Sequence, residues 1–296
     1  MLALFGLLTV AIAGTAFVGA LPASEDADSP ESTADIGDGI DTQPDDVPDL
    51  LSLLDRADAD EDQSTAPPVG DVFAGDESDN TFNGSDGGDY LSGEGGNDTL
   101  SGGSGDDQMH GGTGDDQIDG EDGDDQEYGD LGNDDMSGGD GNDTLHGGSG
   151  NDHIHGGAGD DEILGGYDDD TLIGGEGSDM IQGSEGNDVL DGASGEVIAE
   201  VDYLNGSEGD DHLIGNQGDV MSGGEDADTF EIAQGAVSIM DFSTEDVLVL
   251  QFEGTEPTLT TEVTDTGVTL LADGEPVADL YGLSSFDIDT VKLVAA

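Results

Sequence analysis

The stretch that decides the fold is GGSGNDHIHGGAGDDEILGG, residues 147–166, which holds two successive copies of one nine-residue unit. Each copy has glycine at its first, second and fourth positions, aspartate at its sixth and an aliphatic residue at its eighth. The unit recurs without loss of phase thirteen times from Gly75 to Asp191, and four further units continue to Glu231. Because a fixed period of this kind is typical of repeat architectures, the sequence predicts a solenoid of about 17 units.

Two of the last four units depart from nine residues. The unit that begins at Gly192 fits the pattern only if residues 197–201 are an insertion, which we expect to bulge out as a loop. The unit that begins at Gly215 is one residue short. Both changes are compatible with a solenoid, because surface loops tolerate insertions and deletions.

The residues at one position of successive units, here called a column, predict how the chain coils. An apolar eighth residue between two mostly polar neighbours is typical of a very short strand with one buried face. Glycines at the first, second and fourth positions are expected to supply the positive φ angles of a tight turn. Two strands and two turns then make one rung, and alternate units stack about 4.8 Å apart. The sequence therefore predicts an all-β fold, a right-handed parallel β-roll, with a small C-terminal β cap.

The sixth column is aspartate in every unit except the first, where Asn80 stands. Its members are Asp89, Asp98, Asp107, Asp116, Asp125, Asp134, Asp143, Asp152, Asp161, Asp170, Asp179, Asp188, Asp202, Asp211, Asp219 and Asp228. Stacking of alternate units places these carboxylates in two ladders, and two charges at that spacing repel by roughly 3 kcal/mol at an effective dielectric constant near 20. The stack therefore needs counter-ions, and the sixth column is the predicted metal-ligand set.

Calcium is the ion that fits this ligand set. The chain has no cysteine, so its metal ligands are oxygens. Ca²⁺ accepts six to eight carboxylate and carbonyl oxygens in flexible geometry, whereas Mg²⁺ requires strict octahedral geometry and keeps its waters. Several bound Ca²⁺ ions are expected, and no catalytic residues or organic cofactor.

The units GGDGNDTLH (138–146) and GGSGNDHIH (147–155) resemble the haemolysin-type, or RTX, calcium-binding nonapeptide GGxGxDxUx. The resemblance covers Gly75 to Glu231. It implies a parallel β-roll whose turns hold Ca²⁺ between successive rungs, in a secreted bacterial protein. It also implies an uncleaved C-terminal signal for type I secretion machinery.

Several units depart from the RTX pattern, and four of these departures bear on the predicted sites and core. Asn80 removes a charge from the sixth column, and Asp168 and Asp226 replace the fourth-position glycine. Glu127 places a carboxylate where every other unit has an apolar core residue. A local irregularity is therefore expected at residues 120–128.

Composition excludes several classes of partner. The chain has 73 acidic residues and only two basic ones, Arg56 and Lys292, for a formal net charge of −71. Such a chain repels nucleic acids and anionic lipid surfaces, because recognition of phosphates depends on Lys and Arg. The natural partners are cations.

The remaining segments predict four regions. Residues 1–23 are a hydrophobic segment that fits either a cleaved signal peptide or a retained membrane anchor through residues 1–21. Residues 24–68 read as a disordered acidic linker, with a short transient helix at 49–56. The roll occupies 69–231. Residues 232–296 alternate apolar and polar residues around two turns and predict two hairpins that cap the open edge of the roll.

The sequence offers no enzyme signature. It contains neither HExxH nor GxSxG, so zinc-protease and serine-hydrolase activities lack their ligands and nucleophile. His146, His153 and His155 lie close in sequence and are read as polar fillers rather than a Zn²⁺ site. The third column has a single threonine, Thr113, and does not favour ice binding.

The preferred interpretation is a non-enzymatic calcium-binding protein that folds on binding Ca²⁺ outside the cytoplasm, secreted or displayed on the cell surface. The alternative is an accessory RTX exoprotein or adhesin that binds a glycan or protein through its C-terminal cap.

Overall fold

A computed structural model describes residues 70–195 and 200–296. The hydrophobic segment 1–23, the linker 24–68 with its expected helix, and most of the predicted insertion lie outside the described residues, so these interpretations stay predictions.

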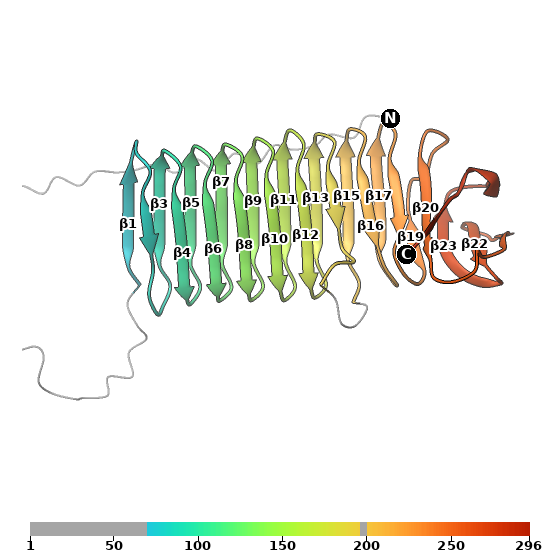
Figure 1. Ribbon diagram of the computed structural model, residues 1–296, viewed down its shortest axis with the longest axis horizontal. Helices are drawn as coiled ribbons and strands as arrows, with labels where there is room; N and C mark the ends of the chain where they lie inside the picture. Colours follow the sequence, from blue (N-terminus) through green and yellow to red (C-terminus); the bar gives the residue numbers. More distant parts are fainter. Residues whose placement is uncertain (1–69, 196–199) are drawn as a thin grey trace, which may run out of the picture. The chain divides into compact units, whose positions relative to one another are not determined.

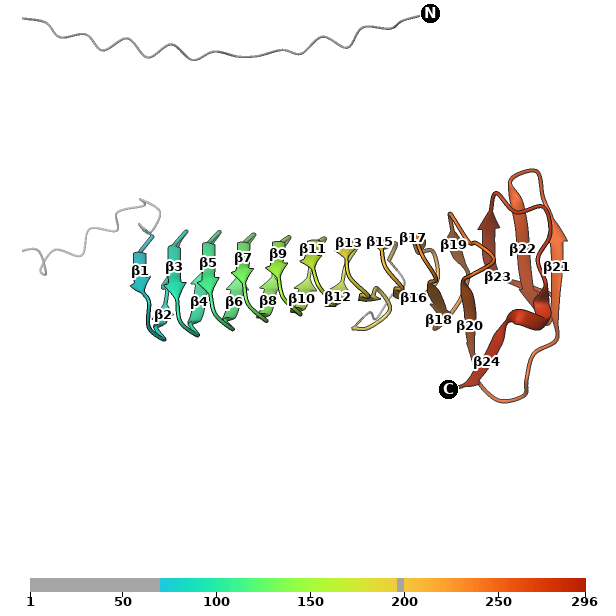
Figure 2. The ribbon, with the colours of Figure 1, turned by 90° about the horizontal axis from the view of Figure 1, so that it is seen from above.

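Two sheets run along the length of the repeat region and form the opposite walls of a roll (Figures 1 and 2). The 13-stranded sheet begins with β1 (Val72–Asp76), β3 (Tyr90–Gly95), β5 (Gln108–Thr113), β7 (Gln126–Leu131), β9 (Thr144–Ser149), β11 (Glu162–Tyr167), β13 (Met180–Glu185), β15 (Tyr203–Glu208) and β17 (Val220–Glu225). The 11-stranded sheet begins with β2 (Thr81–Asn83), β4 (Thr99–Ser104), β6 (Gln117–Asp122), β8 (Asp135–Asp140), β10 (His153–Ala158), β12 (Thr171–Glu176), β14 (Val189–Asp191), β16 (His212–Gly215) and β18 (Thr229–Ile232). The chain crosses from one wall to the other at every unit, so the predicted parallel β-roll is confirmed.

The spacing between paired residues changes at the predicted insertion and at the short unit. In the regular part, Ile154 lies beside Leu172, two units further on. Across the predicted insertion the paired residues stand further apart, and the Asp179 amide donates to Asp202 over 23 residues instead of 18. Across the short unit, the Asp202 amide donates to Asp219 over 17 residues. The sheets therefore absorb both changes by keeping the strands aligned and adjusting the turns.

The strands are longer than the repeat pattern predicts. A typical strand has six residues, from the seventh position of one unit to the third position of the next, as in β9. The turn is confined to positions four to six. The pattern predicts a strand only at the seventh to ninth positions, and the strands are longer because the second- and third-position residues, such as Gly148 and Ser149, also pair in the sheets.

The first-position glycines have a different role from the one expected. Positive φ angles occur at the second and fourth positions, as at Gly148 (114°) and Gly150 (122°), but not at Gly147. A Cβ on Gly147 would lie 2.3 Å from Oδ2 of Asp152 and 2.8 Å from the carbonyl oxygen of Gly165. The first glycine is needed because the sixth-position carboxylate occupies the space of its missing side chain.

The eighth-position side chains form the thin core between the walls. Ile154, Ile163 and Leu172 are completely or almost completely buried. Glu127 takes the same place in β7 and is also fully buried, and β7 pairs with its neighbours in the ordinary register. The expected irregularity at 120–128 is therefore wrong, because the backbone keeps the roll geometry and turns the carboxylate inward.

The chain beyond the repeats extends the same two sheets. After the repeats, β19 (Val237–Ile239) and β20 (Val247–Phe252) add one more parallel strand to each wall. The chain then forms β21 (Leu259–Val263), β22 (Gly267–Ala272) and β23 (Glu275–Tyr281), which pair antiparallel as the two predicted hairpins. A single 3₁₀ turn (Ile288–Thr290) leads to β24 (Lys292–Ala295), which joins β20. No helix in residues 70–195 and 200–296 has the length and apolar character needed to cross a bilayer.

Candidate metal centre

All sixteen predicted aspartates lie in the turns, and all are buried. Alternate units place them in two ladders, one along each edge where the chain passes between the walls. The members of a ladder are connected through the backbone: the Asp143 amide donates to Oδ1 of Asp161 at 2.8 Å, and the Asp152 amide donates to Oδ1 of Asp170 at 2.8 Å. Oδ1 therefore fixes the carboxylate, which leaves Oδ2 as the oxygen that is available to a ligand.

Most of the Oδ2 atoms of the sixth-position aspartates form a row of buried acceptors. No hydrogen-bond donor within the described residues reaches Oδ2 of Asp98, Asp107, Asp116, Asp125, Asp134, Asp143, Asp152, Asp161, Asp170, Asp188 and Asp211. Buried oxygens are rarely left unsatisfied, because desolvating an unpaired polar group costs about 1–3 kcal/mol and more when it is charged. The row is therefore incomplete without a proton or a cation at each turn.

Two of the sixteen aspartates stand in a different environment. Oδ2 of Asp89, near the N-terminal end of the roll, accepts the Ser85 amide at 2.7 Å. Oδ2 of Asp219, in the short unit, accepts the Asn216 amide at 2.6 Å. Backbone amides thus occupy the position that is open in the regular units, and these two residues are the weakest members of the predicted ligand set.

The electrostatics of the turns disfavour bare carboxylates. Burial, reinforced by the charges of Asp179 and Asp143, raises the pKa of Asp161 to about 8. Burial and the charges of Asp152 and Asp188 raise the pKa of Asp170 to about 8. Burial also raises the pKa to about 7 at Asp125, Asp134 and Asp211. At neutral pH these groups favour a proton or a positive ion.

The structure reveals a second polar column that the sequence interpretation missed. The fifth-position side chain accepts the fifth-position amide two units later: the Asn142 amide donates to Asp124 Oδ1 at 2.9 Å, and the Asp160 amide donates to Asn142 Oδ1 at 2.8 Å. This ladder is exposed. Each of its amides donates to a residue 18 positions earlier in the chain, whereas each sixth-position amide of the regular units donates to a residue 18 positions later. The fifth column is Asp or Asn in most units, which was the available signal.

Asp246 is another residue that the sequence interpretation missed. It lies 18 residues after Asp228 and accepts the Asp228 amide through Oδ1 at 3.1 Å, so it extends one ladder beyond the last repeat. Its Oδ2 accepts the Ser243 amide at 2.6 Å, which ends the row of open oxygens. The sequence Asp246-Val247-Leu248-Val249 repeats the last four positions of a unit, and this was the signal that could have identified it.

The donor set fits a hard cation bound jointly by side chains and backbone. Within the described ranges no three His, Cys, Asp or Glu side chains group together as a metal site, so an ion in the turns would complete its coordination with carbonyl oxygens or waters. Such carbonyls are present, because the oxygen of Gly165 lies beside the Asp152 carboxylate at the Gly147 position. Calcium accepts this mixture of carboxylate and carbonyl oxygens.

The three histidines do not form a site. His146 lies in β9 of one sheet, whereas His153 and His155 lie in β10 of the other. His153 faces Asp135 with 3.6 Å between Nδ1 and Oδ1. The reading of these residues as polar surface positions is consistent with this separation.

Comparisons with known proteins address the family. The family model described as the RTX calcium-binding nonapeptide repeat (4 copies) matches residues 70–100, 92–127, 101–136, 128–163, 137–172, 164–196 and 199–230, together just over half of the chain. No curated protein matches the chain. Among solved structures, the chain is similar to the AlgE6R3 subunit of the Azotobacter vinelandii mannuronan C5-epimerase, with 25% sequence identity and a TM-score of 0.27 over 47% of this chain and 80% of that chain. A superposition with so low a TM-score supports no functional comparison. The repeat matches and the Asp ladders agree, and the chain belongs to the RTX family of calcium-binding nonapeptide repeat proteins, whose repeats bind multiple Ca²⁺ ions.

Proposed function

We propose that this protein is a non-enzymatic calcium-binding protein whose roll folds when Ca²⁺ occupies the turns. The observation that carries the proposal is the row of buried Oδ2 atoms on the eleven sixth-position aspartates from Asp98 to Asp211 named above, which no hydrogen-bond donor within the described residues reaches. The ligands in each turn are proposed to be Oδ2 of one aspartate together with carbonyl oxygens of the same and the next rung. The sixteen aspartates are assigned this role as a set, with Asp89 and Asp219 as the weakest members.

The dependence of folding on calcium follows from the balance of forces in the roll. Each unit buries about one apolar side chain in the core, and burial of such a side chain is worth about 1.5–3 kcal/mol. Each unit also buries one carboxylate beside another of like charge. A cation between successive turns converts this repulsion into attraction, and a ligand that binds only the folded state stabilises that state by mass action.

We further propose that the protein acts outside the cytoplasm, secreted or displayed on the cell surface. Extracellular calcium modules work with dissociation constants of about 10⁻⁴–10⁻³ M, a range in which folding would respond to the external calcium concentration. Export through type I secretion machinery, or anchoring through residues 1–21, remains part of this proposal. Fractionation of cells with and without chelator tests it, because a surface-held or secreted protein should leave the cytoplasmic fraction in both conditions.

The folding mechanism is tested by far-UV circular dichroism of the full chain. Addition of millimolar Ca²⁺ to the chelated protein should convert a coil-like spectrum into a β spectrum, and an equal concentration of Mg²⁺ should not. A chelated protein that already has the full β signal would disprove calcium-dependent folding. Equal responses to the two ions would disprove selectivity for calcium.

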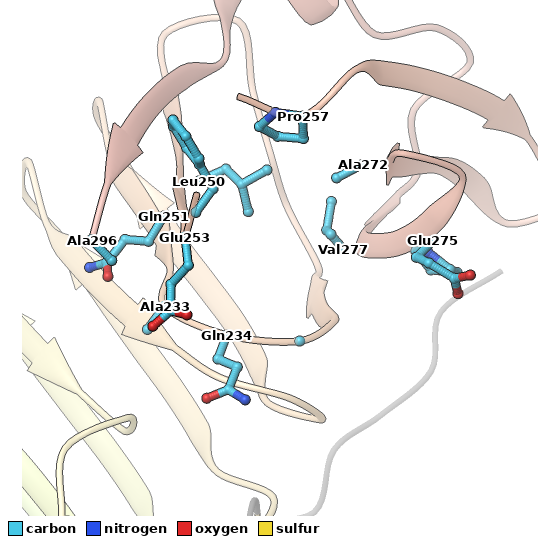
Figure 3. Close-up of a pocket in the computed structure, with 13 residues that line it drawn as sticks. Ala233, Gln234, Leu250, Gln251, Glu253, Pro257, Ala272, Glu275, Val277 and Ala296 are labelled. Atoms are coloured by element: carbon cyan, nitrogen blue, oxygen red, sulfur yellow. The ribbon is translucent and has the colours of Figure 1, made fainter. Parts of the chain in front are cut away.

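A pocket near the C-terminus favours a second candidate function, the binding of a glycan or protein. Its volume is about 630 Å³, which is within the range of ligand sites. Figure 3 shows Pro257, Ala272 and Val277 on one side of the pocket, with Gln251 and Glu253 on the other. The apolar wall and polar rim are compatible with a sugar or a peptide side chain.

Screening of the calcium-loaded full chain against immobilised glycans and proteins tests this second function. A ligand of the pocket should be lost in a Gln234→Ala, Glu253→Ala double variant and retained in Glu176→Gln, Glu185→Gln, which changes exposed residues of the roll. Binding that is unaffected by the first pair of substitutions would exclude the pocket.

A further inference from the structure

Glu127 is the one carboxylate among the apolar residues of the eighth column, and the roll closes around it. Its exposed fraction is 0%, in a column position that holds Met109 two units earlier and Leu145 two units later. Neither side-chain oxygen has a hydrogen-bonding partner of normal geometry. The Gly120 amide interacts with the carboxylate without reaching that geometry, and a buried glutamate whose charge is not compensated is costly, so the structure requires a group that neutralises it.

The surroundings of Glu127 differ from those of every other eighth-position side chain. At the first-position glycine of its unit, Gly120, a Cβ atom would lie 2.3 Å from the carbonyl oxygen of Gly138, 2.4 Å from Oδ2 of Asp125 and 2.8 Å from Oε1 of Glu127. At the other first-position glycines of the regular units, the three nearest atoms come from at most two residues and include at most two oxygens. Three oxygens from three residues are therefore the nearest atoms beside Gly120, which holds for none of the other described first-position glycines.

A proton would satisfy only part of this cluster. One proton can join Glu127 to one neighbouring oxygen, which leaves the rest of the cluster unpaired. A divalent cation interacts with all three oxygens at once, and Ca²⁺ accepts carboxylate and carbonyl ligands together.

We propose that Glu127 is a calcium ligand and that Asp125, Glu127 and the carbonyl of Gly138 bind one divalent cation on the inner side of the turn. No other regular unit of the roll can form this site, because its eighth residue is apolar. The inference rests on the proposed role of the sixth-position aspartates, since Asp125 belongs to that set. The site contributes an additional carboxylate from inside the core, so it is the turn that holds calcium most tightly.

The test counts the calcium ions on the full chain by native mass spectrometry during a calcium titration. Wild type is compared with Glu127→Gln, with Glu127→Leu, which restores the residue type of the column, and with Asp122→Asn, which removes an exposed charge from the same unit. Both Glu127 variants should lack the first ion to bind at low calcium, whereas Asp122→Asn should match wild type. Because leucine fits the column, Glu127→Leu should retain the calcium-loaded β spectrum even if Glu127→Gln does not fold.

The outcomes separate this site from the general function. If Glu127→Leu binds the same number of ions as wild type with the same affinities, Glu127 is only a protonated core residue and the proposal is overturned. If wild type binds no calcium, the proposed function fails and this site fails with it. Loss of one early ion in Glu127→Leu, with the later ions unchanged, supports the site.

Discussion

The repeat part of the roll, residues 70–231, and the C-terminal part, residues 232–296, share two sheets but differ in what lies between them. Most repeats bury one apolar side chain and one carboxylate; the unit with Glu127 buries two carboxylates, and the first unit has Asn80 in place of the aspartate. In the C-terminal part the described residues include a dense apolar cluster with Phe242, Leu250 and Leu270, and no buried carboxylate. Phe242 packs edge-on against Phe286 with ring centroids 5.5 Å apart.

This difference predicts that the proposed need for a cation is confined to the repeats. The described strands beyond Glu231 bury apolar side chains and no carboxylate, so we expect their stability not to depend on ions. The repeats use the same backbone geometry with a thin core and a charged edge, so their stability is expected to follow the occupancy of the turns. The four predictions below test this difference.

Removal of calcium should have the largest effect. In excess chelator, amide hydrogen exchange of the full chain should show loss of protection throughout the repeats, from β3 to β17. Protection in the β22–β23 hairpin should persist longer, because its stability derives from apolar burial. The same chain in saturating calcium is the control. Simultaneous loss of protection in both parts would mean that the molecule is one cooperative unit.

Substitution inside one ladder should have the next largest effect. Asp143→Asn together with Asp161→Asn removes two charges from successive rungs and should raise the calcium concentration at the folding midpoint tenfold or more. The estimate follows because a hydrogen bond or ligand contact to a charged group is worth about 1.5–3 kcal/mol, and about 1.4 kcal/mol is a factor of ten. Circular dichroism during calcium titration measures the midpoint.

The matched control for the ladder is Glu176→Gln together with Glu185→Gln, which also removes two charges but from exposed strand positions. Its midpoint should stay close to that of wild type. Equal shifts in the two double variants would refute the special role of the sixth column, since net charge alone would then explain the response.

Glycine substitutions should separate the tight turns of the repeats from the looser C-terminal loops. Gly150 has φ of 122°, and an added Cβ would lie 1.8 Å from the carbonyl oxygen of Gly132. Gly254 has φ of 84° and no atom within 4 Å of that position. Both alanine variants incur backbone strain of about 1–2 kcal/mol, and Gly150→Ala adds roughly 1–3 kcal/mol of steric overlap. Urea unfolding in saturating calcium should rank them in this order, and similar losses would contradict the close stacking of the turns.

Acidification of the metal-free protein should have the smallest effect. The pKa of Asp161 and of Asp170 is raised to about 8 in the roll, against an ordinary value of 3.8, so the folded state binds protons more tightly than the unfolded state. The stability that protonation gives is fully present below about pH 3.8 and is lost as pH rises to about 8. The chelated chain should therefore gain β structure as pH falls through this window.

The control for acidification is Asp161→Asn together with Asp170→Asn, which makes two ladder positions neutral at every pH. Its circular dichroism spectrum in chelator should depend less on pH than that of wild type. A wild-type spectrum that is constant between pH 8 and pH 4 would show that repulsion between buried carboxylates does not control metal-free folding.

Much of the fold could be predicted from the columns of the repeat. The nine-residue period, the apolar eighth position and the aspartate at the sixth position predicted a parallel roll with two Asp ladders, and the pairing of Asp143 with Asp161 is as expected. The register across residues 197–201 also follows, because an insertion of five changes the pairing distance from 18 to 23 residues. These features recur at fixed spacings along the chain, so counting residues is sufficient to find them.

Other features could not be found by counting. The inward direction of Oδ2, the steric need for Gly147, the exposed fifth-position ladder and the burial of Glu127 each depend on where a side chain points once the turns are stacked. The sequence suggested an irregular strand at Glu127, whereas pairing with β5 and β9 keeps that strand regular. The sequence by itself determined the period, the two ladders and the oxygen chemistry of the turns. Only the tertiary structure decided which oxygens face a ligand, because that choice depends on contacts between residues 18 apart that form when one rung stacks on the next.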